Sequence, residues 1–189
     1  MDKNLLTEKR NKALESWEKL TTPEILKRNL ILTSLYLSAF EILMNSIVDQ
    51  LRDFYTSDLK NGKLVPNERY KTEVKNLHKK ILHASCLWLQ NNGVITKEDI
   101  KEIDKIREHR NEIAHELPNF LVDVDWNVNL RYLESIRQLV QKIDIWWMKE
   151  FIIPVNPDFD GVKVKDNEMQ SGKMLLLDII LGIALDAES

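Results

Sequence analysis

The longest apolar stretch of the chain, residues 30–48, most constrains what it can fold into. It lies inside a segment from about 24 to about 55 whose spacing predicts one long helix. Apolar residues fall on nearly every face of that helix, a pattern typical of a central bundle helix or of a membrane span. Glu41 and Asn45 interrupt the stretch, and a charged continuation follows it at Asp49, Arg52 and Asp53. These polar residues favour a bundle and no membrane span.

Further apolar periodicities predict more helices around this one. They cover about 4–20, 67–91, 96–116, 127–151 and 173–186, and we expect a surface loop at 55–67 and a turn-rich segment at 154–172. Thr96 and Asp99 resemble a capping box, and Asn91-Asn92-Gly93 a helix end. No credible strand pair is found. The sequence predicts one all-α domain, 1–189, an antiparallel helical bundle of about six helices.

Composition sets limits on function. The balance of 27 basic to 30 acidic residues argues against a strongly basic nucleic-acid binder, although a local basic cleft stays possible. Cys86, the single cysteine, has no disulfide partner in the chain and reads as buried filler. The first residues are too polar for a signal peptide, so we expect a reducing, cytoplasmic setting. The C-terminal helix is too short to span a bilayer and should dock on the bundle or on another chain.

One arginine occupies an expected core position. The helix at 96–116 has a buried stripe at a spacing of three and four: Ile103, Ile106, Ile113 and Leu117. Arg110 falls at the place that this spacing leaves open, which is costly unless its guanidinium is paired or faces a wet cleft. Glu41, the lone carboxylate of the apolar stretch, is a candidate partner. His115 follows five residues later, and histidine is the side chain type whose unperturbed charge change falls near neutral pH.

The six residues Arg110-Asn111-Glu112-Ile113-Ala114-His115 resemble the Arg-x4-6-His motif of the HEPN superfamily, in which a polar residue, often Asn, follows the arginine. The resemblance implies a HEPN-like bundle that cleaves RNA as a homodimer without metal or cofactor, leaving 2′,3′-cyclic phosphate ends. It also implies a toxin or phage-defence setting with a possible antitoxin partner. Arg110 would hold the phosphate, His115 would move the proton and Asn111 would orient one of them. Glu41 would fix the guanidinium.

Helix geometry adds an independent expectation. Positions 110 and 115 lie about 140° apart around an α-helix, so a complete site needs groups from another helix or subunit. Structural roles are the alternative: His115 as a partner of the helix dipole and Arg110 as a partner of Glu41, in an inactive HEPN-like module that binds nucleotide, RNA or a protein. Leu117 replaces the tyrosine that accepts a nucleotide in some HEPN toxins, which puts that form of control in doubt.

The remaining polar residues predict less. Arg107 and His109 flank the motif, and we expect a solvated helix face there; positive charge for an RNA cleft is the alternative. His78 and His83 are five residues apart, so a single helix would not converge them on a metal, and no metal site is expected. Trp146 beside Trp147 widens the apolar face of the 127–151 helix, towards a partner subunit in our interpretation.

Overall fold

The computed structural model describes residues 3–188, and the chain is mostly helical with one two-stranded hairpin. The α-helices are α1 (Lys3–Thr21), α2 (Pro23–Met44), α3 (Gln50–Phe54), α4 (Ile81–Asn91), α5 (Lys97–His115), α6 (Leu117–Val122), α7 (Arg131–Trp147) and α8 (Gly172–Glu188). The strands are β1 (Thr56–Lys60) and β2 (Lys63–Pro66). The predicted all-α class therefore holds in its coarse form.

The central element is one continuous helix, Pro23–Phe54, in which a π-helical turn at Asn45–Asp49 joins α2 to α3. It contacts α1, α5, α6, α7 and α8, and completely buries Tyr36, Leu43, Ile47 and Leu51. By length and composition this helix could also cross a membrane. However, 44% of its most apolar 18-residue stretch is buried, and the core helix of a soluble protein can have the same length and composition. The expected helix at 24–55 is confirmed.

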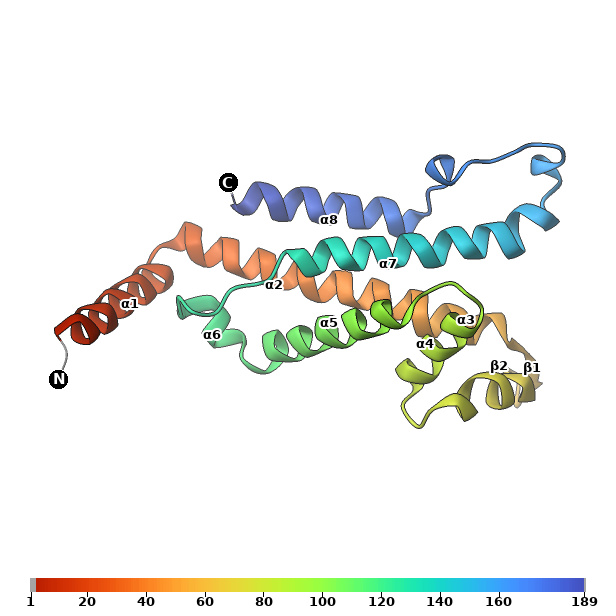
Figure 1. Ribbon diagram of the computed structural model, residues 1–189, viewed down its shortest axis with the longest axis horizontal. Helices are drawn as coiled ribbons and strands as arrows, with labels where there is room; N and C mark the ends of the chain where they lie inside the picture. The colour runs from red at the N-terminus through yellow and green to blue at the C-terminus, as the bar shows by residue number, and fades with distance from the viewer. Residues whose placement is uncertain (1–2, 189) are drawn as a thin grey trace.

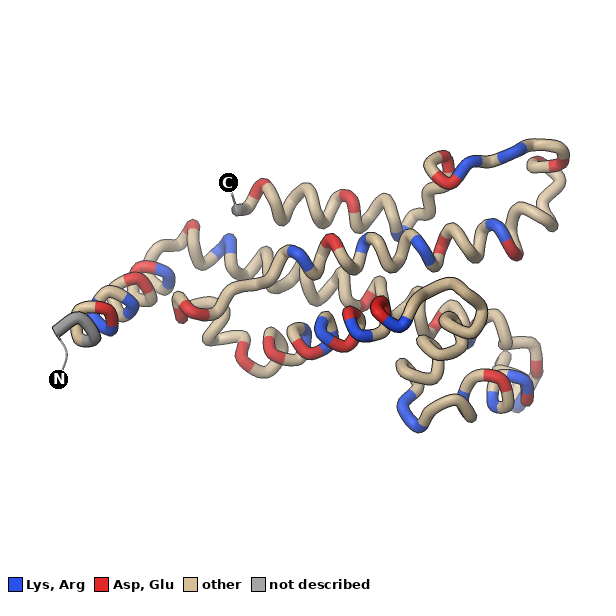
Figure 2. The backbone as a smooth tube through the Cα atoms, viewed as in Figure 1, with Lys and Arg blue, Asp and Glu red and all other residues tan. Residues whose placement is uncertain are grey.

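The long helices that follow are arranged around α2 in alternating directions. Figure 1 shows α7 and α8 on one side of α2 and α5 with α6 on the other, while α2, α5, α7 and α8 alternate in direction along the chain. Figure 2 shows charged residues dense on α1 and α5 and sparse on α2 and α8. This difference follows from burial, because α2 is covered on several sides and α5 on one.

Both predicted helix ends around α5 are confirmed. Thr96 and Asp99 form a reciprocal capping box at the start of α5. At the end of α4, Gly93 has a φ of 73°, and the N–H of Val94 donates to the carbonyl of Leu89 at 2.9 Å. That pattern is a Schellman motif, in which glycine takes the left-handed conformation.

The expected surface loop at 55–67 is wrong, as is the absence of a strand pair. These residues form the antiparallel β1–β2 hairpin, with Lys60 paired to Lys63 across a two-residue turn. Asn61 and Gly62 at the turn both have positive φ, 51° and 73°. Such a turn matches the right-handed twist of two strands, and Asn-Gly is its strongest sequence signal.

The expected helix at 67–91 is also wrong. A π-helical turn at Tyr70–Val74 and a 3₁₀ turn at Lys75–Leu77 come first, His78 is fully extended, and only then does α4 begin. Tyr70 and Val74 are buried at 4% and 0% exposure, as are the inner residues of α4. The break lets both apolar sets reach the core, which periodicity alone does not reveal.

Smaller departures occur at the ends of the bundle. The helix expected at 96–116 ends at His115, before Pro118 as predicted, but a further short helix, α6, begins at once with Pro118 in its first turn, where its missing N–H is harmless. The helix expected from 127 begins at Arg131. In α1, which was expected to pack an apolar face, Leu14, Trp17 and Leu20 are 58%, 65% and 43% exposed, and the side chain of Leu5 lies outside the described residues.

Helix α8 docks on the bundle, as expected. It packs against α2 and α7 and buries Met174, Leu177, Ile180 and Ala184. Two ion pairs tie its first half to α7, Lys173 with Asp144 at 3.0 Å and Arg137 with Asp178 at 2.7 Å. Its outward side exposes Leu175, Leu176, Ile179 and Ile183.

The burial of α2 predicts an unequal response to one type of substitution. Leu43→Ala, at a fully buried position of α2, should cost about 2–5 kcal/mol of unfolding free energy because it leaves a cavity. Leu14→Ala, at a 58% exposed position of α1, should change it by less than about 1 kcal/mol. Urea denaturation followed by circular dichroism measures both. Equal losses would contradict the described core.

Candidate functional site

The motif residues lie in the last two turns of α5. This helix turns its buried stripe, Ile103, Ile106 and Ile113, towards the core. The hydroxyl of Tyr36 on α2 donates a hydrogen bond of 3.0 Å to the carbonyl of Ile106. That buried hydrogen bond and the packed stripe set the position of α5 along α2. They therefore also set which residues of α2 lie next to Arg110.

Arg110 meets α2 where the sequence predicts. Its Nη2 lies 3.4 Å from Oε1 of Glu41, and its guanidinium lies over the ring of Phe40, with Cζ 5.5 Å from the ring centroid. The side chains of Arg110 and Glu41 are 34% and 65% exposed, so the pair is at the surface and contributes little to stability. Nε of Arg110 is buried without a hydrogen-bond partner among the described residues. The core position is thus tolerated because the guanidinium reaches the edge of the bundle.

His115 and Asn111 lie on the outward side of α5. Both are exposed and line an open depression of about 410 Å³ whose other lining residues are Glu108, Glu112 and Glu116. His115 makes no hydrogen bond or ion pair with any residue in 3–188. Three carboxylates around one imidazole favour a cation and repel a phosphate. Bringing a phosphate here therefore requires positive charge from elsewhere.

A single chain does not assemble the predicted site. Arg110 contacts Phe40 and Glu41 on α2, whereas the depression at His115 includes no residue of α2. The physical reason is the five-residue spacing, which separates the two side chains by about 140° around α5. Of the four predicted site residues, the fold joins Arg110 with Glu41 and Asn111 with His115.

His109 is not on a solvated face, and that expectation is wrong. Its side chain is 11% exposed and contacts the rings of Tyr36, Phe120 and Tyr132 at centroid distances of 5.0, 5.7 and 5.4 Å. The backbone N–H of Asn129 donates to Nε2 at 3.0 Å. An accepting Nε2 places the proton on Nδ1, which then donates to Glu112 at 3.2 Å, so the ring is neutral in this arrangement.

Arg107 also departs from the expected solvated face. It is 29% exposed and pairs with Asp104 at 3.2 Å, and Asp104 is in turn 3.4 Å from Nε2 of His83. Position 109 follows Ile106 by three, so the spacing of the buried stripe could have indicated the burial of His109. Nothing in the spacing indicates the contact between Arg107, Asp104 and α4.

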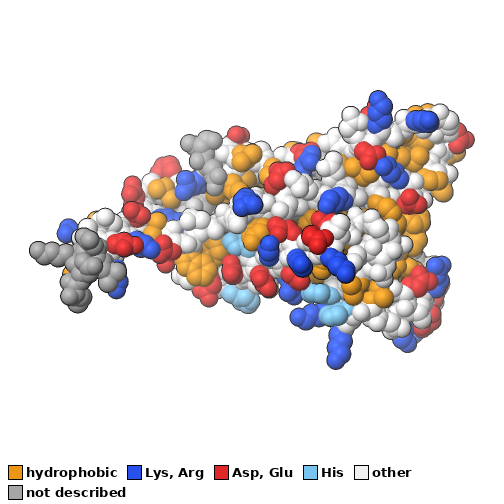
Figure 3. Space-filling view, in the orientation of Figure 1, with side chains coloured by type: hydrophobic (Ala, Val, Ile, Leu, Met, Phe, Trp, Pro, Cys, Tyr) orange, Lys and Arg blue, Asp and Glu red, His pale blue; other side chains and the backbone are white. Residues whose placement is uncertain are grey.

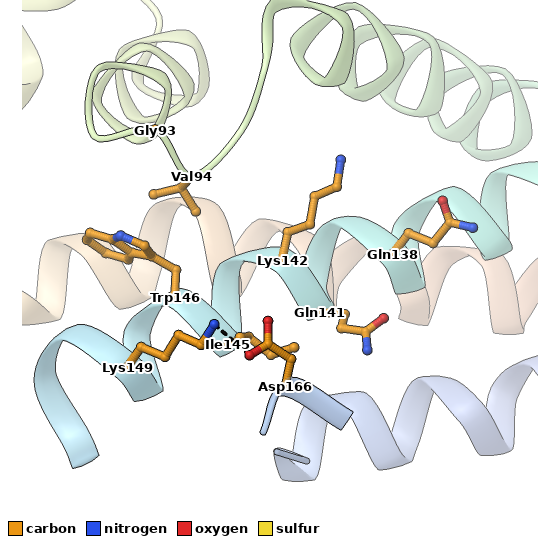
Figure 4. A pocket seen from close by; sticks show the side chains of 9 residues that line it. All are labelled: Gly93, Val94, Gln138, Gln141, Lys142, Ile145, Trp146, Lys149 and Asp166. Carbon is orange, nitrogen blue, oxygen red and sulfur yellow. Dashed lines mark ion pairs between the residues drawn. The ribbon is translucent and has the colours of Figure 1, made fainter. Parts of the chain in front are cut away.

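A separate depression lies beside α7, away from the motif. Figure 4 shows Trp146 and Val94 facing each other across it, with Lys149 joined to Asp166 from the segment before α8. That ion pair measures 2.6 Å, and Lys142, also at this depression, pairs with Asp99 at 2.8 Å. Both lysines are therefore neutralised within the chain. Trp146 packs on Trp88 and Trp147, which gives it an intramolecular role beside the expected one at a partner.

The chemistry that the described residues offer is acid–base and cationic. Within residues 3–188, no group of three or more His, Cys, Asp or Glu side chains is placed to hold a metal ion. His78 and His83, expected to point apart, lie with ring centroids 5.0 Å apart because the chain breaks between them. Burial raises the pKa of the Cys86 thiol to about 12, so it is an unreactive core residue.

No protein-family model, curated protein or solved structure matches this chain.

The two histidines of α5 predict opposite responses to truncation. His109→Ala should lower the unfolding free energy by about 2–4 kcal/mol, because it leaves a cavity among three rings and an unpaired N–H at Asn129. His115→Ala, at an exposed position without partners, should change it by less than about 0.5 kcal/mol. Thermal and urea unfolding of both variants measures this difference. A destabilising His115→Ala would indicate a structural role for that residue.

Proposed function

We propose that this chain is a HEPN-type, metal-independent endoribonuclease that acts as a homodimer in the cytoplasm, in a toxin or phage-defence setting. The observation that carries the proposal is the placement of Arg110 and His115. Both reach the surface at the end of α5, but on different sides of the helix, so each chain presents two halves of a site. A second copy that brings its Arg110 to the first copy's His115 would complete it.

The half-site at Arg110 is prepared for an anion. Glu41 and the ring of Phe40 hold the guanidinium in place, and the Arg110 side chain remains 34% exposed. A guanidinium held in this way can bind a phosphate in two-pronged fashion and stabilise negative charge as it develops during cleavage. Glu41 then acts as a positioning residue for Arg110.

The half-site at His115 is prepared for proton transfer. An exposed imidazole without partners can take the proton of a ribose 2′-hydroxyl, or donate one to the leaving 5′-oxygen. Asn111 lies one helical turn before it and lines the same depression, where its amide can orient the imidazole or the phosphate. Attack of the 2′-oxygen on phosphorus displaces the 5′-oxygen and leaves a 2′,3′-cyclic phosphate and a 5′-hydroxyl.

The side of α2 next to Arg110 is open to a second subunit. Ser34, Ser38 and Glu41 follow at a helical spacing of four and three, and all three are exposed. A partner helix could approach closely over these small serines and place its own residues beside Glu41 and Arg110. Helix α8 lies across α2 from α5 (Figure 1), so its exposed residues Leu175, Leu176, Ile179 and Ile183 do not serve this contact.

A binding module is the second candidate, and the acidic lining favours it. Glu108, Glu112 and Glu116 around His115 disfavour a phosphate there unless a partner's cation offsets them. In this reading the chain is an inactive HEPN-like domain that binds a protein partner such as an antitoxin at this surface, or binds RNA or nucleotide away from His115.

Direct cleavage separates the two candidates. Pure wild-type protein should cleave RNA in excess EDTA and leave 2′,3′-cyclic phosphate ends, detected by mass spectrometry. Arg110→Ala and His115→Ala should each reduce the rate by about 100-fold or more, in proteins that stay folded. Cleavage that survives either substitution, or no cleavage by the wild-type dimer, would overturn the endoribonuclease.

Mixing the two inactive variants tests the composite site. If Arg110 of one subunit acts with His115 of the other, a heterodimer of Arg110→Ala and His115→Ala chains contains one intact site and regains activity. Refolding the two variants together and assaying cleavage against each variant alone measures the effect. Complete inactivity of a purified heterodimer would contradict the proposed pairing across subunits.

A further inference from the structure

A second feature of the chain carries positive charge that carboxylates among the described residues neutralise only in part. A groove of about 590 Å³ lies between the end of the central helix, β2 and the segment before α4. Its basic lining is Arg52, Lys75, Lys79 and His78, and its apolar lining includes Tyr70 and Ile81. No carboxylate lines it among the described residues. We refer to these six residues as the basic groove.

The break before α4 creates this arrangement. His78 is extended, with φ −161° and ψ 153°, so His78 and Lys79 lie on a bend between two helical segments. The backbone N–H of Lys80 donates to Nδ1 of His78 at 3.0 Å. An accepting Nδ1 leaves the proton on Nε2, which can donate to an anion. A continuous helix would have spread these residues over its circumference.

The lysines of the basic groove are available to a ligand. Lys75 and Lys79 make no ion pair with a carboxylate in residues 3–188, and Nζ of Lys75 lies 5.4 Å from the centroid of Tyr70. Arg52 pairs with Asp49 at 3.0 Å, which leaves the groove a net positive charge. In contrast, both lysines of the depression beside α7 are paired, and three glutamates surround His115.

The basic groove connects to the motif through a row of basic side chains. The ring of His78 lies 5.0 Å from that of His83, and His83 and Arg107 both contact Asp104. Arg107 is one helical turn before Arg110 on α5. Figure 3 shows histidine side chains among Lys and Arg side chains at the lower edge of the molecule, where the segment before α4 lies.

The spacing suits a strand of nucleic acid. Along the central helix, Val48 and Arg52 of the groove lie roughly 10 and 16 Å beyond Glu41, at 1.5 Å per residue. Distances of this size can be spanned by a few nucleotides of a single strand. Cations that follow a backbone, beside an apolar surface for base rings, are the features with which proteins hold single strands.

We propose that the basic groove binds a single-stranded segment of RNA a few nucleotides from the bond that is cut. Lys75, Lys79 and His78 bind its phosphates, and Tyr70 and Ile81 form the apolar side against which a base packs. The inference rests on RNA as the substrate of the proposed function. It adds a binding site that lies outside the Arg110–His115 motif.

The test measures RNA binding without cleavage. Full-length His115→Ala protein is titrated with a fluorescently labelled oligouridylate at several potassium chloride concentrations. Adding Lys75→Gln and Lys79→Gln should weaken binding by at least about tenfold at low salt. It should also reduce the slope of log K against log salt by roughly 1.4, at about 0.7 for each lost phosphate contact. The control variant combines Lys142→Gln and Lys149→Gln, which remove the same charge beside α7. It should change neither the affinity nor the slope of log K against log salt.

Each outcome decides between site and function. Unchanged binding by the Lys75/Lys79 variant, or an equal loss in the Lys142/Lys149 control, overturns the groove and leaves cleavage by Arg110 and His115 intact. If only the Lys75/Lys79 variant loses binding, and the wild-type protein does not cleave RNA, the groove stands and the proposed endoribonuclease activity is overturned. Uridine monophosphate and unlabelled oligouridylate are compared as competitors. If both displace the labelled strand at the same concentration, the groove binds a mononucleotide, and the proposal that it binds a single strand is overturned.

Discussion

The structure depends on covering one helix. Pro23–Phe54 is apolar on nearly every face, so its burial requires neighbours on several sides at once. Helices α7 and α8 supply one side and α5 with α6 the other, each contributing its own buried row. Positions such as Tyr36, which is fully buried and bonded to the carbonyl of Ile106, leave α5 little freedom to shift. The location of Arg110 beside Glu41 is a consequence of that packing.

Two histidines on one helix illustrate how packing separates structure from chemistry. His109 and His115 are six residues apart on α5, yet one is enclosed by three rings and the other is exposed without a partner. An exposed imidazole without partners is accessible to a substrate proton, whereas an enclosed one is not. The motif histidine meets that condition, and the flanking histidine serves the junction with the segment that leads to α7.

Charge is distributed unevenly over a chain with a net charge of −3. Carboxylates gather around His115, paired lysines lie beside α7, and unpaired lysines lie in the basic groove. A polyanion responds to such local fields and not to the net charge. The RNA site that we propose in the basic groove is therefore compatible with the acidic overall composition, and contacts through His83 and Asp104 link the groove to Arg107.

The sequence by itself determined the central helix and the helix signals around α5. It also offered Glu41 as a candidate partner of Arg110, and the bundle as one of two surfaces on which α8 could dock. Each rests on local rules of spacing, capping or charge that act within a few residues or along one stripe. The sequence also contained the Asn61-Gly62 turn signal, but the hairpin was missed because its strands, exposed over most of their length, lack the alternation that marks a buried face. Only the tertiary structure decided the break at His78 and the basic groove. These arise where segments distant in the chain compete for the same core, and no local pattern records which one is buried.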